Sequence, residues 1–322
     1  MITLKKKKSK DFVILNLTDF QLLASEWTNE TEKGKEILYT IDTLYKRAKP
    51  DLVTLSGDLA YAGDLDALSH MGKVLDSYCV PWAPVFGNHD NDGGLELVDK
   101  TAECLSKFKY FTFEVGEKEL GRGNYIINIE QDGKVLHSVF MMDTHDRVNY
   151  VNTQGDSSYE WSSLNEAQIK WYKENVSLLK SLGSKESTLI IHIPINSYRD
   201  AWWAAYNPKY RAEDIPPRDN SDPKYWNKGY EGSFGVRYEG VSSYPQNDGV
   251  LDAILEMDHT KNILCGHSHT NTFSIPYKGV RFTFAVKTGR GSYCNPFLNG
   301  GTVYRIDSQG NSTVRHEFVD LD

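Results

Sequence analysis

The chain has 322 residues and a formal net charge of −8, and 39% of its residues are hydrophobic. The acidic balance excludes general nucleic-acid binding, which requires a basic surface, and the hydrophobic content is enough for a substantial core. No apolar run is long enough to cross a bilayer, so no membrane partner is expected.

The terminal residues and the cysteines indicate the cytoplasm. No apolar stretch follows the basic N-terminal residues, so no signal peptide is visible, although a signal removed beforehand would leave no trace. The four lysines at residues 5–8 are predicted to form a solvated tail. The scattered cysteines are interpreted as reduced core residues, and they are Cys79, Cys104, Cys265 and Cys294.

The first third of the chain alternates strands and helices. Short, nearly continuous apolar runs predict buried strands at residues 12–17, 52–55 and 80–86. Helical spacing of apolar residues predicts helices at residues 33–49 and 65–78. The order β-α-β-α-β indicates a parallel sheet with right-handed crossovers.

The remainder mixes helices with strands and contains one long irregular segment. Helices are predicted at residues 94–107, 165–182 and 248–257, and strands at 124–130, 134–142, 188–193, 262–265, 273–275, 280–286, 302–306 and 312–318. Residues 143–164 are expected to be mostly a polar loop. Residues from about 196 to 247 are aromatic and rich in proline, without clear periodicity. We interpret residues 1–322 as one domain with an insertion at about 196–247.

One stretch, Val85-Phe86-Gly87-Asn88-His89-Asp90, organises the prediction of function. A buried strand ends at a glycine and is followed by three polar residues, at the edge where open α/β folds place ligands. An amide can bind a divalent metal, an imidazole can move a proton, and a carboxylate can hold that imidazole in one tautomer. The alternative is an ordinary turn rich in Asn and Asp.

Residues that can bind metals also follow other predicted strands, and they are Asp19, Asp58, His192, His267 and His269. His267 and His269 are two residues apart in an extended segment, so both can reach one site. Tyr61 lies three residues after Asp58 and shares its face at the start of a turn or helix. With Asn88, these groups fit a pair of metal ions about 3.5–4 Å apart, bridged by a carboxylate and a hydroxide. A single such histidine is more often a core or turn residue, but the repetition at strand ends favours a site.

The order of these motifs resembles a known family. The motifs are Asp19-Phe20-Gln21, Gly57-Asp58, Gly87-Asn88-His89-Asp90, the strand-end His192 and Gly266-His267-Ser268-His269. Together they resemble the calcineurin-like metallophosphoesterase superfamily over the segment from Asp19 to His269. The resemblance implies an α/β fold, specifically a four-layer α-β-β-α sandwich, and two metal ions (iron, manganese or zinc) at the strand ends.

The resemblance also implies a role for each motif residue. Carried over by position, the metal ligands would be Asp58, which bridges both ions, Asn88, His192 and His267 on one ion, and Asp19 and His269 on the other. His89 would lie outside the metal ligands and protonate the leaving alkoxide, and Asp90 would orient it.

One position departs from the superfamily pattern. Gln21 stands where most members have a histidine, so one metal ion loses an imidazole. The branch resembling purple acid phosphatases also lacks that histidine and uses the tyrosine of a Gly-Asp-x-x-Tyr motif, which residues 57–61 match. Either Tyr61 or Gln21 could therefore replace the missing imidazole as a ligand of that metal ion. A second histidine that often follows His192 in that branch is missing, which leaves the contact with phosphate unassigned.

The expected activity is hydrolysis of a phosphate ester, either a monoester or a diester, by a hydroxide that bridges the metal ions. The partner would be a phosphorylated small molecule or another phosphoester, and the oligomeric state is left open. The aromatic insertion could line the cleft or pack on itself, and Arg290 could reach a phosphate or lie in an exposed turn. The alternative function is a binding scaffold of the same fold without catalysis, which Gln21 favours and His89 opposes.

Overall fold

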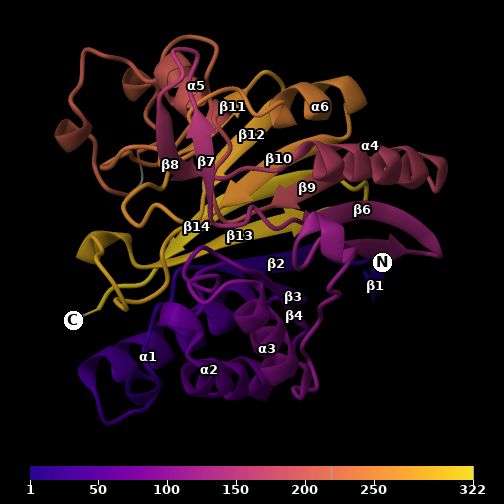
Figure 1. Ribbon diagram of the computed structural model, residues 1–322, viewed down its shortest axis with the longest axis vertical. Coiled ribbons are helices and arrows are strands. Elements are labelled where there is room, and N and C mark those ends of the chain that lie inside the picture. Colours follow the sequence, from indigo (N-terminus) through magenta and orange to yellow (C-terminus); the bar gives the residue numbers. More distant parts are fainter. Residues whose placement is uncertain (219, 322) are drawn as a thin grey trace.

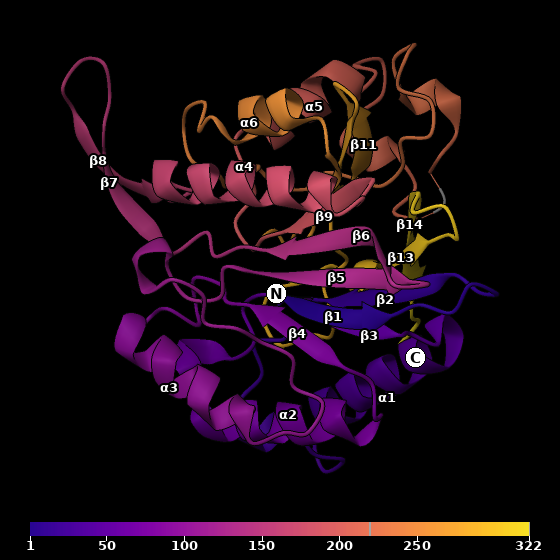
Figure 2. The same cartoon turned by 90° about the vertical axis from the view of Figure 1, so that its right-hand side faces the viewer.

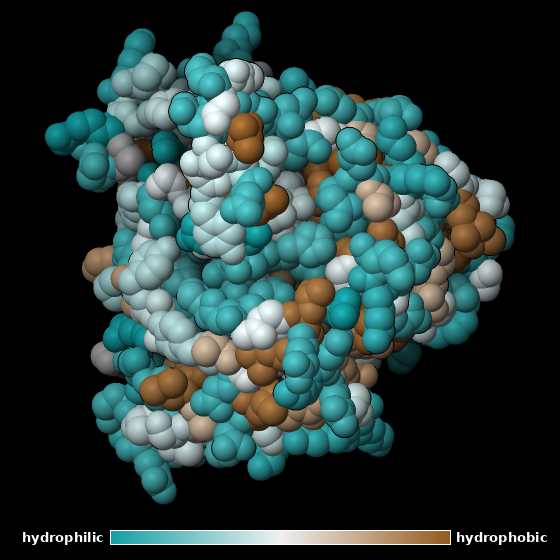
Figure 3. Space-filling model, in the orientation of Figure 1, coloured by the Kyte–Doolittle hydropathy of each residue, from teal (hydrophilic) through white to brown (hydrophobic). Residues whose placement is uncertain are grey.

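The computed structural model describes residues 1–218 and 220–321 and shows two β-sheets packed face to face between two layers of helices (Figures 1 and 2). The strand orders are β14-β13-β2-β3-β4 in one sheet and β1-β5-β6-β9-β10-β12-β11 in the other. The expected four-layer α-β-β-α sandwich is confirmed. The face shown in Figure 3 is largely hydrophilic and has a hollow near its centre.

The five-stranded sheet contains the predicted N-terminal β-α-β-α-β unit. Its strands are β2 (Phe12–Leu17), β3 (Leu52–Ser56), β4 (Trp82–Val85), β13 (Gly300–Ile306) and β14 (Ser312–Phe318). Strands β2, β3 and β4 are parallel, as expected, and β13 joins β2 in antiparallel orientation. The helices on its outer face are α1 (Glu32–Ala48), α2 (Leu65–Ser77) and α3 (Leu95–Ser106) (Figure 2).

The seven-stranded sheet is formed by later parts of the chain and by the N-terminal strand. Its strands are β1 (Ile2–Lys5), β5 (Tyr125–Gln131), β6 (Lys134–Met141), β9 (Glu186–Ile190), β10 (Thr260–Cys265), β11 (Ser274–Tyr277) and β12 (Val280–Phe284). The outer helices are α4 (Glu166–Ser181), α5 (Ser197–Ala205) and α6 (Val250–Met257). Strands β6, β9, β10 and β12 run parallel, so β9 and β10 end at the same edge. Short 3-10 helices lie at Ala24–Glu26, Tyr61–Gly63, Lys118–Leu120, Ala212–Asp214, Pro223–Tyr225 and Pro296–Leu298.

The apolar side chains form three layers of core that match the sandwich. The central layer joins the two sheets, with Ile14 and Val85 on one side and Ile127 and Val139 on the other. Each sheet also packs on its own helices through one further apolar cluster. This packing explains why the strands are apolar on both faces and why polar residues gather at the strand ends.

A two-stranded arm was not predicted from the sequence. Strands β7 (Arg147–Val151) and β8 (Ser157–Trp161) pair in antiparallel orientation and project from the sandwich (Figure 2). All of their residues are exposed or half-buried. Val148 and Tyr150 alternate with polar residues, but the run is short and lies within a polar segment, so it provides only a weak strand signal.

The expectations about the lysine run and about the burial of the cysteines are wrong. The lysine run is not a free tail, because β1 pairs with β5 and Lys6 is 6% exposed, with its ammonium donating to Gln131 Oε1. The four cysteines are free thiols, but only Cys265 is buried, and Cys79 is exposed. Strand-like sequence around a residue does not fix its burial, because Cys79 follows α2 in a turn.

The aromatic insertion packs mainly on the protein itself. Trp202, Tyr225 and Trp226 are buried in the cluster between the seven-stranded sheet and its helices. Trp203 is the exception and is 65% exposed. Of the two alternatives for this segment, the contacts therefore favour self-packing for most of its aromatic side chains. Among the helices that the structure describes, none combines the length and hydrophobicity needed to span a bilayer.

Candidate metal centre

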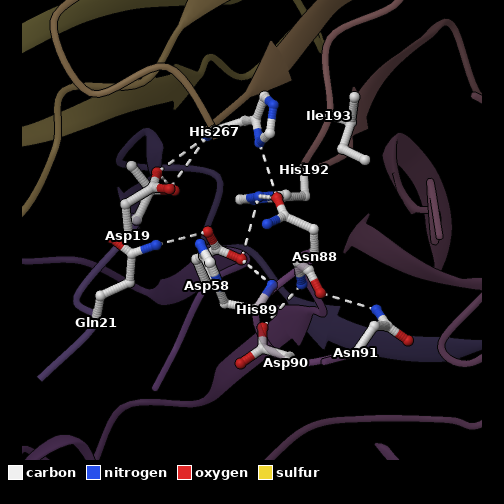
Figure 4. Close-up of polar contacts among 12 residues, drawn as sticks. Asp19, Gln21, Asp58, Asn88, His89, Asp90, Asn91, His192, Ile193 and His267 are labelled. Atoms are coloured by element: carbon white, nitrogen blue, oxygen red, sulfur yellow. Dashed lines mark hydrogen bonds and ion pairs between the residues drawn. The ribbon is translucent and has the colours of Figure 1, made fainter. Parts of the chain in front are cut away.

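Residues from the ends of five strands meet at one edge of the sandwich (Figure 4). Asp19, Asp58 and Asn88 follow β2, β3 and β4, while His192 and His267 follow β9 and β10. All five side chains, and that of His269, belong to residues that are at most 9% exposed. The buried parallel strands therefore bring together six of the seven expected metal ligands, from positions up to 250 residues apart in sequence.

The first group of donors contains Asp19, Asp58 and His269, whose ligand atoms all lie within 4.8 Å of one another. His269 Nε2 is 3.4 Å from Asp19 Oδ1. His269 Nδ1 lies 2.8 Å from the carbonyl oxygen of Tyr293, so Nδ1 is the donor and the Nε2 lone pair faces the carboxylate. A backbone carbonyl in this role is a common way to orient an imidazole that binds metal.

The second group contains Asn88, His192 and His267. Asn88 Oδ1 lies 3.1 Å from His192 Nε2 and 2.9 Å from His267 Nδ1. His192 Nδ1 lies 2.7 Å from the carbonyl oxygen of Ser56, which again directs Nε2 into the site. The amide oxygen and two imidazole nitrogens thus converge on one point, as ligands of a single metal ion would.

Asp58 lies between the two groups and contacts both. Its Oδ1 is 3.3 Å from His192 Nε2, and its Oδ2 accepts a hydrogen bond of 2.8 Å from Gln21 Nε2. The backbone amide of His89 donates to Oδ1 at 2.9 Å. Gly87 is required here for close approach, because a Cβ atom at that position would overlap Asp58 Oδ1. The glycine before Asn88 thus allows the turn after β4 to pack directly on Asp58.

The charges of the site stabilise the ionised carboxylates. Burial alone would raise the pKa of Asp19 and of Asp58, but His269 and His192 respectively outweigh it and lower both values. Burial would lower the pKa of His192, but Asp58 and Asp19 raise it to about 9. Burial and the neighbouring His192 lower the pKa of His267 to about 3. Ionised carboxylates and a neutral imidazole are the forms that bind metal ions.

The backbone of the site is strained. Asp19, Gln21, Asp58 and His267 have φ values of 56°, 44°, 53° and 73°. Residues other than glycine rarely adopt this left-handed region, and the cost persists only where the surrounding contacts impose it. Four such residues within one cluster indicate that the chain holds these side chains in place for a purpose other than stability.

His89 lies at the rim of the cluster, and its orienting partner differs from the expected one. Its Nδ1 is 2.9 Å from Asp92 Oδ2, and the His89 side chain is 37% exposed. Asp90 does not make the expected contact with His89, because its carboxylate accepts hydrogen bonds from the backbone amides of Gly87 (2.8 Å) and Leu59 (3.0 Å). Asp90 therefore ties the turn after β4 to the turn after β3. Burial and the Asp58 charge raise its pKa to about 7.

Of the two residues that could replace the missing imidazole, Gln21 contacts Asp58 within the cluster, whereas Tyr61 contacts His89 at the rim. Gln21 is 1% exposed, and its Oε1 is buried without a hydrogen-bond partner. The Tyr61 ring lies edge-on to the His89 ring, with 5.8 Å between ring centroids. A buried carbonyl oxygen without a partner is costly, and a cation is one ligand that would satisfy it. The carboxylates, imidazoles and amides of the cluster fit hard or borderline metal ions.

Three further residues at the site were not predicted from the sequence. Lys287 is 2% exposed and donates to the backbone oxygen of Asp19. Trp161, from the projecting arm, lies edge-on to His267 with centroids 4.4 Å apart, and the Arg147 guanidinium stacks 3.7 Å from the Trp161 ring. Lys287 follows a predicted strand in the same way as the ligands do, a signal that could have identified it.

Arg290 was expected either to reach a phosphate or to lie in an exposed turn. Its guanidinium forms an ion pair with Glu36 at 3.0 Å.

Solved structures with the same architecture include two phosphatases. A dimetal phosphatase from Danio rerio has a TM-score of 0.58 and 12% identity, and the match covers 95% of this chain and 96% of that chain. The purple acid phosphatase PPD1 from yellow lupin (Lupinus luteus) seeds has a TM-score of 0.53 and 11% identity, with coverage of 95% and 51%. At such low identity these similarities show the fold alone.

The family follows from the sequence. A family model described as calcineurin-like phosphoesterase matches residues 12–271, and the chain belongs to this family. A relative from Arabidopsis thaliana named "Probable inactive purple acid phosphatase 28" is 25% identical over an alignment of 274 residues, which covers 77% of this chain. The matched segment spans 60% of that relative. The resemblance expected from the motifs is thus confirmed, and purple-acid-phosphatase-like proteins are among the relatives.

Proposed function

We propose that this chain is a metal-dependent phosphoesterase that hydrolyses a phosphate ester at the cluster of strand-end residues. The observation that carries the proposal is the position of Asp58 between two convergent groups of donors. One carboxylate shared by two sets of ligands is the arrangement that a pair of metal ions requires. Membership of the phosphoesterase family supports the reaction class, and phosphorylated compounds are the corresponding substrates.

In this proposal Asp58 would be shared by two metal ions. Asn88, His192 and His267 would hold one ion, and Asp19 and His269 would hold the other. Tyr61 is the proposed replacement for the missing imidazole, and Gln21 Oε1 is the competing donor. A phenolate is anionic and hard and suits a trivalent ion such as iron(III), whereas an amide oxygen is a weaker, neutral donor. Manganese and zinc are the other candidate metals.

Metal ions bound there would polarise the phosphoryl group and lower the pKa of water enough to provide a hydroxide nucleophile. The contribution of the protein is to position the substrate and to complete the proton transfer. The Asp92 carboxylate fixes Nδ1 of His89 as the donor, so Nε2 is free at the exposed rim. Nε2 of protonated His89 can donate its proton to the leaving oxygen as the ester bond breaks.

His89 is suited to hold that proton. Burial lowers its pKa, but the carboxylates of Asp58 and Asp92 outweigh this effect and raise the pKa above the usual histidine range. Asp90 acts as a positioning residue for the two turns that carry Asp58 and Asn88. We further propose that residues 1–322 form one domain, since the insertion at about 196–247 adds its aromatic residues to the same core.

The test is hydrolysis of a panel of phosphomonoesters, nucleotides and phosphodiesters by the purified, metal-analysed protein. Turnover of at least one class, lost on metal removal and restored on metal addition, supports the proposal. The panel also separates monoesterase from diesterase activity. Asp58→Asn is the matched variant, because it preserves the side-chain volume but removes the shared carboxylate.

A second candidate function is a binding scaffold of the same fold without catalysis. Gln21 favours it, since an imidazole of the common ligand set is lost, and the name of the plant relative describes that relative as inactive. The exposed His89 with its Asp92 partner opposes it, because a scaffold has no need of a positioned proton donor. A protein that binds both metal ions but turns over neither monoesters nor diesters would be a scaffold.

A further inference from the structure

A second candidate site lies between residues 237–241 and helix α5, which is labelled at the top of Figure 1. The pocket has a volume of about 190 Å³, and its lining residues are Arg199, Trp202, Trp203, Arg237, Gly240 and Val241. One water molecule needs only about 10–15 Å³ on the same measure, so the pocket has room for a small oxyanion and part of the group that carries it.

Two arginines of this pocket lack a carboxylate partner. Arg199 donates from Nε to the carbonyl oxygen of Val241 and from Nη2 to that of Ser243, each at 3.1 Å, so Nη1 remains available. Arg237 Nε is buried and has no hydrogen-bond partner. Among the residues that the structure describes, neither Arg199 nor Arg237 forms an ion pair, whereas the arginines Arg122, Arg211, Arg218, Arg290 and Arg315 each do.

The two guanidinium groups also disfavour each other. Burial, followed by the neighbouring Arg199 cation, lowers the pKa of Arg237. Two like charges held together, one with a buried and unpaired N–H, destabilise the free protein, and an anion between them would remove that cost. Guanidinium groups bind phosphate and related oxyanions through pairs of parallel hydrogen bonds, which makes a phosphate group the matching ligand.

The tryptophans provide walls for the same ligand. The Arg237 Cζ lies 5.9 Å from the ring centroid of Trp202 and 5.2 Å from that of Trp203. Trp202 is 2% exposed and belongs to the core, whereas Trp203 is 65% exposed. A tryptophan this exposed beside a cation is typical of binding surfaces, where large aromatic side chains and arginine are enriched.

We propose that this pocket binds a phosphate group between Arg199 and Arg237, beneath Trp203, as a site separate from the metal centre. The two sites are neighbours in the fold, because Arg237 pairs with Asn271 and the Glu239 carboxylate accepts a hydrogen bond of 2.7 Å from the backbone amide of Thr270, the residue after His269. The ligand is either free phosphate or the phosphate of an organic ester.

The experiment counts phosphate sites by calorimetric titration of the purified protein with inorganic phosphate at constant ionic strength. Arg237→Met removes the guanidinium but keeps an unbranched apolar side chain in its place, and Arg237→Lys retains the charge. Arg211→Met is the matched control, because Arg211 belongs to the same insertion but is already paired with Asp214 at 3.2 Å. The metal centre is intact in all these proteins, so its contribution to phosphate binding is the same in each.

The wild type and Arg211→Met should bind one more equivalent of phosphate than Arg237→Met. Loss of the charged hydrogen bonds should weaken binding at the pocket by at least about tenfold, and Arg237→Lys should lose less. Equal numbers of sites in wild type and Arg237→Met would overturn the proposal, whether or not the metal centre binds phosphate. Phenylphosphonate distinguishes the sources, since tighter binding than phosphate indicates an organic ester and equal binding indicates the free ion.

A second measurement covers the case in which Arg237→Met does not fold. Trp203 is exposed, so Trp203→Leu should be tolerated. Phosphate should change the tryptophan fluorescence of the wild type, and this change should be smaller in Trp203→Leu, in which Trp202 of the pocket and Trp161 of the metal centre remain. No phosphate-dependent change in the wild type, or a change of the same size in Trp203→Leu, would contradict the pocket.

Discussion

Replacement of His89 by alanine should separate proton transfer from metal binding. The contact of His89 with Asp58 is made by its backbone amide, which alanine retains, while its imidazole lies at the rim and contacts Asp92. Both metal ions should therefore remain bound in His89→Ala. The loss should appear in the chemical step, where the leaving oxygen needs a proton.

The structure predicts a larger loss of turnover for replacement of His89 than for replacement of its partner Asp92. Loss of a general acid costs about 10²–10⁴-fold in turnover. The pair of His89 and Asp92 has side chains 37% and 43% exposed, and ion pairs at such positions are worth about 0–1 kcal/mol. Asp92→Asn should therefore slow turnover by no more than about fivefold, since ~1.4 kcal/mol corresponds to a factor of ten.

The assay compares a poor leaving group, in phenyl phosphate, with a good one, in 2,4-dinitrophenyl phosphate. His89→Ala should lose the full factor with phenyl phosphate and less than about tenfold with the dinitrophenyl ester, which needs no proton. Equal losses with both esters would refute the proton-donor role. A loss of metal from His89→Ala would place His89 among the structural supports of the centre instead.

Three further predictions concern metal content, colour and stability. Asp58→Ala should lose both metal ions and Asn88→Ala only one, as measured by elemental analysis, and loss of a single equivalent from Asp58→Ala would contradict the bridge. Iron(III)-reconstituted protein should show a visible charge-transfer band that is absent in Tyr61→Phe; a colourless wild type, or colour that survives in Tyr61→Phe, would leave Gln21 or solvent in that position. His137 is 0% exposed, and burial lowers its pKa to about 4, below the ~6.5 of an unfolded chain. Protonation therefore favours the unfolded state, so the stabilisation is complete above pH 6.5 and is lost as the pH falls toward 4. Between pH 7.5 and 5 the wild type should lose about 2 kcal/mol more unfolding free energy than His137→Gln, measured with urea, and parallel pH profiles would exclude this contribution.

The strand ends could be predicted because local and global signals agree there. Asp19, Asp58 and Asn88 each follow a buried apolar run, and parallel strands place such residues at one edge. Which of these side chains contact one another depends on the conformation of the turns after the strands and not on the residue types. Asp92 rather than Asp90 contacts His89, because Asp90 is needed to bind backbone amides, and no pattern in the sequence reveals that choice.

Other elements escaped prediction because their contacts are distant in sequence or their residues are exposed. The arm of β7 and β8 has no buried residue, yet its Trp161 reaches His267. Strand β1 ends in the lysine run, whose charges indicate a free tail until the pairing with β5 is known. Helix α5 begins without a side-chain cap, within a segment whose aromatic residues show no helical period. In each case tertiary contacts stabilise an element for which the local sequence provides little signal.

The most direct test of the proposed phosphoesterase is to measure metal content and phosphoester hydrolysis on the same preparation of the unmodified chain. We expect two metal ions per chain and turnover of at least one monoester or diester. Chelation should remove the ions and abolish turnover, and added metal should restore the ions and the activity. Two bound ions with no turnover of either class of ester would contradict it and identify the chain as a scaffold that has kept the site without the reaction.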